Sequence, residues 1–201
     1  MNSITTTASI GKQEIKRLLD NWGLWRDTYR WAELRTCYAP DATMVTTWFD
    51  GRATDFVEAS IRASTSGTLV EHFMGPSTIE INGLRALAET RLMLLVRGEL
   101  NGVEVDVTCY GRFFDRLVCI DGAWVILERM PIYEKDSLSA VDSRMAVDLD
   151  CTRLQTYPLG FRHLAYMQAT GGATITMHIP AHNSEAQSSL YAAGKNWLKN
   201  V

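Results

Sequence analysis

Three ionisable side chains lie in stretches of the sequence that are otherwise apolar or aromatic. Asp27 follows a tryptophan-rich segment in LWRDTYRW, His72 lies in LVEHFMG, and Arg129 lies in WVILERMPIY. An imidazole titrates near neutral pH, so His72 could act as a general base, and a carboxylate on its far nitrogen would raise its basicity. Arg129 could polarise a carbonyl group or receive a leaving group. These residue types are suited to proton abstraction.

Each of the three residues also has a purely structural interpretation. Asp27 could be a solvated carboxylate at a helix end, paired with a neighbouring arginine, because most aspartates near helix ends are exposed. His72 could be a core or edge histidine with a satisfied hydrogen bond. Glu128 and Arg129 must point to opposite faces of a strand. Arg129 could therefore face the concave side of a sheet, or it could be a surface or interface arginine.

Aromatic and basic residues near these positions are candidates for substrate binding. Trp25 and Tyr29 flank Asp27, and Tyr110 and Arg112 share one face of a predicted strand. The sequence has no phosphate loop, no GxSxG and no dinucleotide fingerprint, so we expect no cofactor. We expect no metal site either, because the histidine spacing does not match that of zinc ligands.

Helices must come first along the chain. Apolar residues recur every three or four positions over 15–25, which predicts a helix ending near Asp27, and a second short helix follows over 31–38. The run 42–49 is rich in β-branched and aromatic residues and predicts a strand, with Asp50-Gly51 as a turn. Residues 53–65 are amphipathic and predict another helix.

From residue 69 the pattern changes to period two. Two short strands, LVEHFM and STIEI, are separated by Gly75-Pro76. Three longer strands follow, each preceded by an Asn-Gly or Asp-Gly turn signal, and they predict an antiparallel meander over 84–99, 103–117 and 123–133. Helices followed by a curved sheet make an α+β fold.

The last 65 residues differ in pattern from the rest. A polar stretch precedes a short helix that should end at Gly171-Gly172. Ser184 and Gln187 fit a capping box, which opens a helix with three inward-facing residues, Leu190, Ala193 and Trp197. This segment is too short for a second domain. We expect it to pack on the first domain or on a neighbouring subunit.

Composition sets the broad class of the protein. The chain has 201 residues, 46% hydrophobic and 21% charged, which predicts one globular domain with a real core. A net charge of −3 does not favour nucleic acid or an anionic membrane as a partner. No apolar run is long enough to span a bilayer, and the polar start is unlike a signal peptide. Four cysteines without a CxxC motif indicate reduced thiols in a cytoplasmic protein.

The order of these features resembles the SnoaL-like branch of the nuclear transport factor 2-like superfamily, which includes scytalone dehydratase and hexachlorocyclohexane dehydrochlorinase. The segments that carry the resemblance lie within residues 10–136: the helix ending near Asp27, LRTCYAPDATM, the strand with His72, and DGAWVILERMPIYEKD. It implies a cone-shaped α+β barrel over 1–136, in which a curved mixed sheet wraps around N-terminal helices and encloses a deep apolar pocket. Residues 137–201 would form a helical C-terminal extension.

The same resemblance implies roles for the candidate residues. An aspartate–histidine dyad in the pocket of these enzymes falls on Asp27 and His72, and a pocket arginine falls on Arg129. Tyr29 and Tyr110 could replace the tyrosine pair that polarises the carbonyl in scytalone dehydratase. The extension looks like that of longer bacterial members, among them lyases that release formaldehyde from lignin-derived diaryl diols.

We therefore expect a cofactor-independent lyase, a dehydratase, dehydrohalogenase or formaldehyde-releasing enzyme, acting on a small aromatic or polycyclic molecule. Six tryptophans and 13 tyrosines and phenylalanines suit such a pocket, although most of them must belong to the core. The alternatives are a SnoaL-type cyclase or isomerase, and a non-catalytic ligand-binding or association subunit. We expect a homo-oligomer, a trimer rather than a dimer, formed through an uncovered convex face of the sheet.

Overall fold

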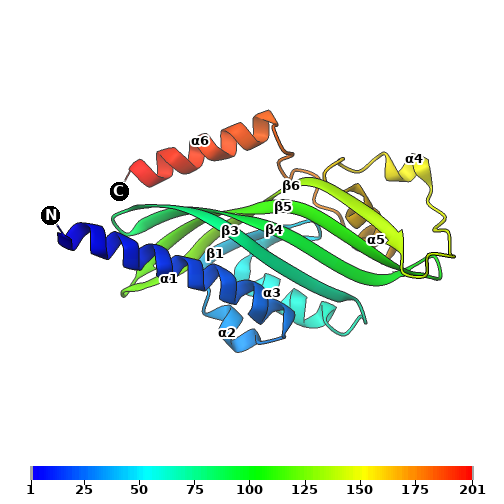
Figure 1. Cartoon of the computed structure of the whole chain (residues 1–201), viewed down its shortest axis with the longest axis horizontal. Coiled ribbons are helices and arrows are strands. Elements are labelled where there is room, and N and C mark those ends of the chain that lie inside the picture. Colours follow the sequence, from blue (N-terminus) through cyan, green and yellow to red (C-terminus); the bar gives the residue numbers. More distant parts are fainter. Residues whose placement is uncertain (1, 201) are drawn as a thin grey trace.

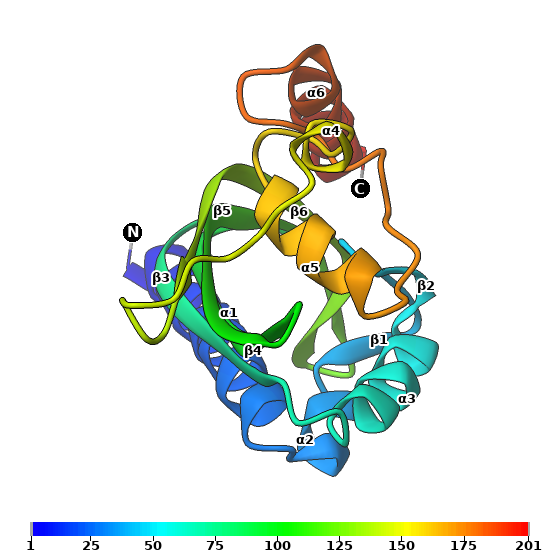
Figure 2. The same ribbon diagram turned by 90° about the vertical axis from the view of Figure 1, so that its right-hand side faces the viewer.

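A curved six-stranded sheet forms the body of the protein (Figures 1 and 2). The computed structural model describes residues 2–200, with side chains described from residue 9 onwards. The strand order is β2-β1-β6-β5-β4-β3; β1 is parallel to β6, and the other pairs are antiparallel. The strands are β1 (Tyr38–Thr46), β2 (Phe49–Arg52), β3 (Leu69–Asn82), β4 (Arg85–Leu100), β5 (Val103–Ile120) and β6 (Ala123–Ala140). Because β2 and β3 are both edges, the sheet curves without closing.

Three N-terminal helices accompany this sheet, namely α1 (Asn2–Asp27), α2 (Trp31–Arg35) and α3 (Ala53–Ala63). Ile15, Leu19 and Trp22 recur at three- and four-residue steps on α1 and are fully buried, as the sequence periodicity predicts. The Trp22 ring packs edge-on against Phe113 of β5, with 5.4 Å between ring centroids. We call the face of the sheet that contacts α1 the inner face, and the other the outer face.

Two of the predicted hairpin turns are confirmed. Asn101-Gly102 and Asp121-Gly122 connect β4 to β5 and β5 to β6, and all four residues have positive φ angles between 49° and 82°. Such left-handed pairs match the twist of antiparallel strands, which is why Asn-Gly and Asp-Gly are preferred there. At the third site Asn82 ends β3, and the turn consists of Gly83 and Leu84.

Local boundaries differ from the sequence prediction in the first part of the sheet. β1 begins at Tyr38, upstream of the predicted strand at 42, and passes through Pro40. Asp50-Gly51 is not a turn, because both residues pair with β1 while Thr47 and Trp48 form the turn. The two short strands predicted around Gly75-Pro76 are one strand, β3, in which a register shift between Met74 and Ser77 absorbs the proline. Proline is tolerated at such irregularities of an edge strand because no ladder hydrogen bond is lost.

The C-terminal extension contributes α4 (Cys151–Leu154), α5 (Arg162–Thr170) and α6 (Glu185–Lys199). The predicted N-cap is confirmed, because Ser184 Oγ accepts from the Gln187 backbone N–H at 3.1 Å. The reciprocal bond of the capping box is displaced by one residue: Gln187 Oε1 accepts from the Asn183 N–H at 2.8 Å rather than from the Ser184 N–H. α5 lies across one end of the curved sheet, whereas α6 lies on the opposite side of the sheet from α1 (Figures 1 and 2).

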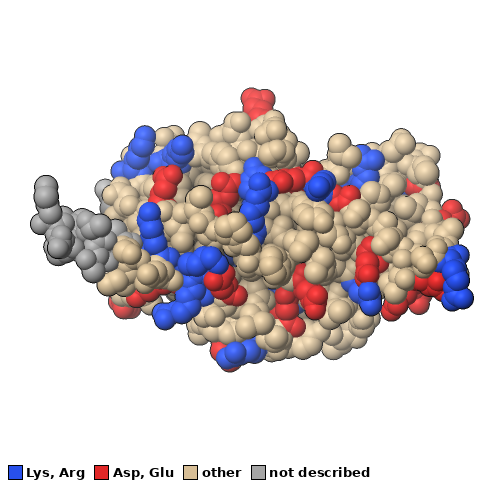
Figure 3. All heavy atoms as spheres, in the orientation of Figure 1, with Lys and Arg blue, Asp and Glu red and all other residues tan. Residues whose placement is uncertain are grey.

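The outer face is partly covered by α6. Leu87, Phe114 and Ile132 of the outer face form a small apolar cluster with Leu198 of α6. The expectation of an uncovered outer face is therefore wrong where α6 packs. On the face shown in Figure 3, basic and acidic side chains are interspersed. In the described part of the chain, no helix has both the length and the apolar character needed to cross a bilayer.

Candidate active site

A cavity of about 490 Å³ opens on the inner face of the sheet. Its walls combine apolar side chains with a few polar ones, an arrangement typical of small-molecule sites of this size. Aromatic rings contribute much of the surface, including those of Trp22, Trp48, Phe56 and Phe113. The lining residues come from α1, α3, α5 and from five of the six strands or their connections, so most of the fold contributes to this cavity.

The structure brings Asp27 and His72 together at the wall of this cavity. His72 Nδ1 lies 2.7 Å from Asp27 Oδ1, and the His72 backbone N–H donates to Asp27 Oδ2 at 2.5 Å. The histidine and aspartate side chains are 11% and 14% exposed, and His72 lines the cavity. Both Asp27 carboxylate oxygens therefore bond to His72, one to its ring and one to its backbone N–H, and together they fix the orientation of the imidazole.

This pairing determines which ring nitrogen of His72 can accept a proton. An ionised carboxylate only accepts hydrogen bonds, so His72 Nδ1 carries a proton and Nε2 of the neutral ring keeps its lone pair. Among the described residues, nothing is hydrogen-bonded to Nε2. The Trp22 ring stands edge-on to the imidazole, with 5.3 Å between centroids, and limits its rotation. The arrangement can accept a proton from a molecule in the cavity.

Local sequence explains why the two side chains meet. On β3, Val70 and His72 both reach the cavity because alternate residues of a strand share a face. On α1, Gly23 lies one helical turn before Asp27. A Cβ at Gly23 would lie 2.6 Å from Met74 Cγ, so glycine allows the helix to approach β3 closely. That close approach places the next turn, with Asp27, beside His72.

Arg129 does not reach the cavity in the described structure. It is fully buried and makes two hydrogen bonds to Asp115, Nε to Oδ1 at 2.7 Å and Nη2 to Oδ2 at 2.9 Å. Its guanidinium lies 4.2 Å from the Trp22 ring centroid and 4.3 Å from that of Phe113. Both rings line the cavity, so Arg129 lies behind them and supports the wall. Glu128 faces outward and pairs with Arg116, as strand alternation predicts.

The predicted substrate-binding residues fall in different places. Tyr29 lines the cavity and adopts a left-handed backbone conformation (φ 61°) where the chain turns from α1 to α2. Trp25 does not line it but packs against the Arg30 guanidinium. Tyr110 and Arg112 do share a face, as predicted, but it is the outer face, away from the cavity; there Tyr110 packs against Lys135.

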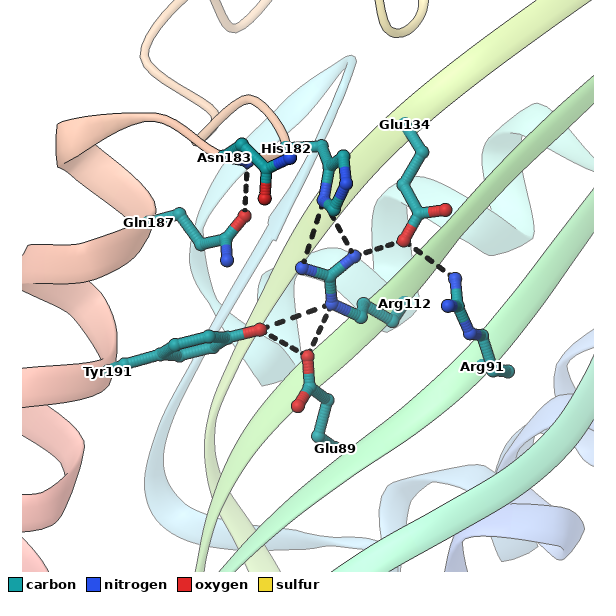
Figure 4. Close-up of polar contacts among 8 residues, drawn as sticks. All are labelled: Glu89, Arg91, Arg112, Glu134, His182, Asn183, Gln187 and Tyr191. Atoms are coloured by element: carbon teal, nitrogen blue, oxygen red, sulfur yellow. Dashed lines mark hydrogen bonds and ion pairs between the residues drawn. The ribbon is translucent and has the colours of Figure 1, made fainter.

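Arg112 holds the C-terminal extension against the outer face instead (Figure 4). Its guanidinium bonds to Glu89 and Glu134, to the Tyr191 hydroxyl at 3.1 Å, and lies 3.4 Å from His182 Nδ1. Tyr191 belongs to α6 and His182 to the segment before it, so the cluster connects three strands to the extension.

Several cavity residues were not found by sequence reasoning. Arg26 could have been suspected, because it lies four residues after Trp22 on the same face of α1. The extension supplies Met167 and Gln168 of α5, and the Thr47 hydroxyl donates to Gln168 Oε1 at 2.7 Å. No short motif marks this contact, which joins residues 121 positions apart.

Comparison with known proteins agrees with this architecture. The family model described as "SnoaL-like domain" matches residues 10–130. Two relatives from Fusarium vanettenii are "Pea pathogenicity protein 2", 29% identical over 98% of this chain and 90% of its own length, and a PEP2-like protein, 30% identical over 92% and 84%. These alignments include the C-terminal extension.

Among solved structures, a Novosphingobium aromaticivorans protein named "Putative Scytalone Dehydratase" superposes with a TM-score of 0.55. It is 19% identical and covers 73% of this chain and 97% of its own, which shows a shared fold. With the family model spanning more than half of the chain, the protein belongs to the SnoaL-like domain family.

Proposed function

We propose that this protein is a cofactor-independent lyase in which His72, oriented by Asp27, removes a proton from a small aromatic or polycyclic substrate. The observation that carries the proposal is the pairing of His72 Nδ1 with Asp27 at the wall of an aromatic-lined cavity. Removal of a proton from carbon, followed by loss of water or halide, would leave an alkene or enone. Removal of a proton from a hydroxyl group would instead release a small aldehyde, and the electrons of the broken C–C bond would form an enolate that is then protonated.

The carboxylate has a defined part in this scheme. When Nε2 takes the proton, the ring becomes a cation, and the Asp27 carboxylate 2.7 Å from Nδ1 stabilises it. Arg129 is assigned to positioning in this scheme, because it contacts the Trp22 and Phe113 rings rather than the cavity. Tyr29, on the cavity lining, is a candidate for polarising the substrate carbonyl.

Two alternative functions remain open to test. A SnoaL-type cyclase or isomerase would use the same cavity without a leaving group. A ligand-binding or association subunit would bind aromatic molecules without turnover. The Asp27–His72 pair favours proton transfer over binding alone, because it lies at the cavity wall and its Nε2 is bonded to no described residue. A cyclase or isomerase would also need a base, and the presence of a leaving group among the products distinguishes a lyase from it.

The test uses a probe whose dehydration is easily seen. Loss of water from 3-hydroxy-1-tetralone begins with removal of a C2 proton, breaks the C3–O bond, and gives 1-naphthol after tautomerisation. In one parallel probe, chloride replaces the 3-hydroxyl group. In another, a hydroxymethyl group at C2 loses its hydroxyl proton and leaves as formaldehyde, and the electrons of the broken C–C bond form the enolate of 1-tetralone. We expect turnover of at least one probe and a loss of about 10²–10⁴-fold in His72→Ala.

The chain offers a matched control at His163. Its ring Nδ1 lies 2.8 Å from Asp136 Oδ1 and its backbone N–H donates to Asp136 Oδ2 at 2.7 Å, the same two-bond pattern, but it does not line the cavity. His163→Ala should keep full turnover. Equal activity of His72→Ala and the wild type would refute the proposal, and binding of 1-naphthol without turnover of any probe would favour the binding-protein alternative.

We also propose that the chain forms a homo-oligomer, with a trimer as the expected form. Phe73, Met93 and Tyr110 stand in one cross-strand row on the outer face, and Phe73 is 64% exposed. This row lies apart from the cluster that α6 covers. Light scattering should show an assembly that Phe73→Asp weakens, and a monomer at micromolar concentration would contradict this part of the proposal.

A further inference from the structure

Arg26 is a buried cation at the cavity wall. It is 7% exposed, and no described residue forms a hydrogen bond or ion pair with its guanidinium. Three arginines are buried in the described chain, and the other two, Arg112 and Arg129, are each paired with carboxylates. The guanidinium carbon of Arg26 lies 5.8 Å from the centroid of the Trp31 ring.

Nearby carboxylates do not satisfy this guanidinium. Asp27 is adjacent in sequence, but both of its oxygens are hydrogen-bonded to His72. Glu99 also lines the cavity, yet it is exposed and forms no ion pair with Arg26 in the described structure. Burial lowers the pKa of Arg26, and Asp27 opposes that effect. An arginine remains charged even so, and a buried charge is costly unless something pairs with it.

Arg26 and the proposed base, His72, line the same cavity. Trp22 and Arg26 are four residues apart on α1, so both side chains emerge from one face of the helix and both line the cavity. The Trp22 ring in turn packs against His72. A molecule in the cavity therefore meets the base and the unpaired cation together.

We propose that Arg26 binds an oxyanion of the substrate, so that this cavity takes aromatic molecules carrying a carboxylate or an acidic hydroxyl in preference to neutral ones. The inference deepens the proposed lyase function and rests on it for the reaction, but ligand selectivity can be measured without turnover. An aromatic acid would pair its ring with the apolar wall and its oxyanion with the guanidinium.

Calorimetric titration with two probes of the same shape tests this selectivity. 2-Naphthoate carries a carboxylate and 2-naphthamide a neutral amide, and both are bicyclic molecules of a size suited to the cavity. Wild-type protein should bind the naphthoate about 10- to 100-fold more tightly, the range of a charge-assisted hydrogen bond. Arg26→Met should remove that preference while keeping naphthamide affinity, which also shows that its cavity is intact.

Control variants separate the possible explanations. Arg26→Lys should retain part of the preference, because it keeps the charge. Arg30→Met removes an exposed arginine that pairs with Glu33 and should change nothing. His72→Ala should keep the preference even though the proposed base is gone, so a failed lyase function and a failed Arg26 assignment give different results.

Three outcomes would overturn the inference. The first is equal affinity of the wild type for naphthoate and naphthamide, and the second is an Arg26→Met variant that still prefers the naphthoate. The third is a wild-type protein that binds neither probe at millimolar concentration, because a cavity with an available cation and aromatic walls should hold such an acid.

Discussion

Replacing Asp27 by asparagine should abolish catalysis while leaving the fold nearly intact. Asparagine has the same shape as aspartate, and its side-chain oxygen can accept the backbone N–H of His72. The amide NH₂ then faces His72 Nδ1, where it can only donate. Nδ1 must therefore lose its proton, and the proton moves to Nε2. Nε2, which carries the lone pair in the wild type, becomes a donor and can no longer act as a base.

The expected magnitudes differ for activity and for stability. A histidine held in the wrong tautomer by such a substitution costs about 10⁴-fold in turnover in a well-studied triad, and we expect about 10³–10⁴-fold here. Asp27→Asn preserves the number of hydrogen bonds, so the free energy of unfolding should fall by about 1 kcal/mol or less. Asp27→Ala removes both bonds to His72 and should cost about 3–6 kcal/mol, since bonds to charged groups contribute about 1.5–3 kcal/mol each.

Three measurements on the same samples test this reasoning. The 1-naphthol assay or its chloride and hydroxymethyl counterparts give turnover, and urea unfolding gives stability. Nitrogen NMR of labelled histidine reports the tautomer directly and should show the His72 proton moving from Nδ1 to Nε2 in Asp27→Asn. An asparagine variant that keeps wild-type turnover, or one that is inactive with an unchanged tautomer, would contradict the assignment of Asp27 as the orienting group.

Three further predictions concern the core. Arg129→Met leaves the Asp115 carboxylate buried without a partner and should lower the free energy of unfolding by about 3–5 kcal/mol; turnover loss with unchanged stability would instead support a direct role for Arg129. Burial raises the pKa of the Cys37 thiol to about 12, although the charge of Arg129 opposes this, so at pH 8 Cys37 is a thiol; Ellman's reagent should label exposed Cys151 at least 100-fold faster, as followed by mass spectrometry. Gly111→Ala places a Cβ 2.5 Å from a backbone oxygen of β6 and should cost about 1–3 kcal/mol in urea unfolding; wild-type stability would show that β5 can move away.

Sequence periodicity predicts the helix and the strand that carry the site residues. The helix that carries Asp27 follows from the spacing of Ile15, Leu19 and Trp22, and period-two alternation identifies the strand that carries His72. Their contact also needs the close approach at Gly23, which sequence alone shows only as a helix-weakening residue. Position within an element was therefore predictable, whereas the hydrogen bond between the two elements came from the family resemblance.

Which face of the sheet a residue occupies, and which residue it pairs with, were harder to predict than whether it lies in a helix or a strand. Alternation shows that Tyr110 and Arg112 share a face, but which face lines the cavity depends on how the sheet curls around α1. The partner of Arg129 depends on the register of β5 and β6, which shifts at two positions, one on each side of the Asp115–Arg129 pair. The extension is harder still, since contacts such as Thr47 with Gln168 join segments far apart in the chain.

The proposed proton-transfer groups and the cavity wall that includes α5 come from different parts of the chain. The proposed base, its carboxylate and the unpaired cation all come from the first 72 residues, whereas Met167, Gln168, Gly171 and Ala173 come from the extension. In the proposed scheme, exchanging residues 141–201, the part of the extension beyond β6, between relatives would alter the cavity wall and leave the proposed proton-transfer groups in place. One recombination event could then change which ligands the cavity accepts.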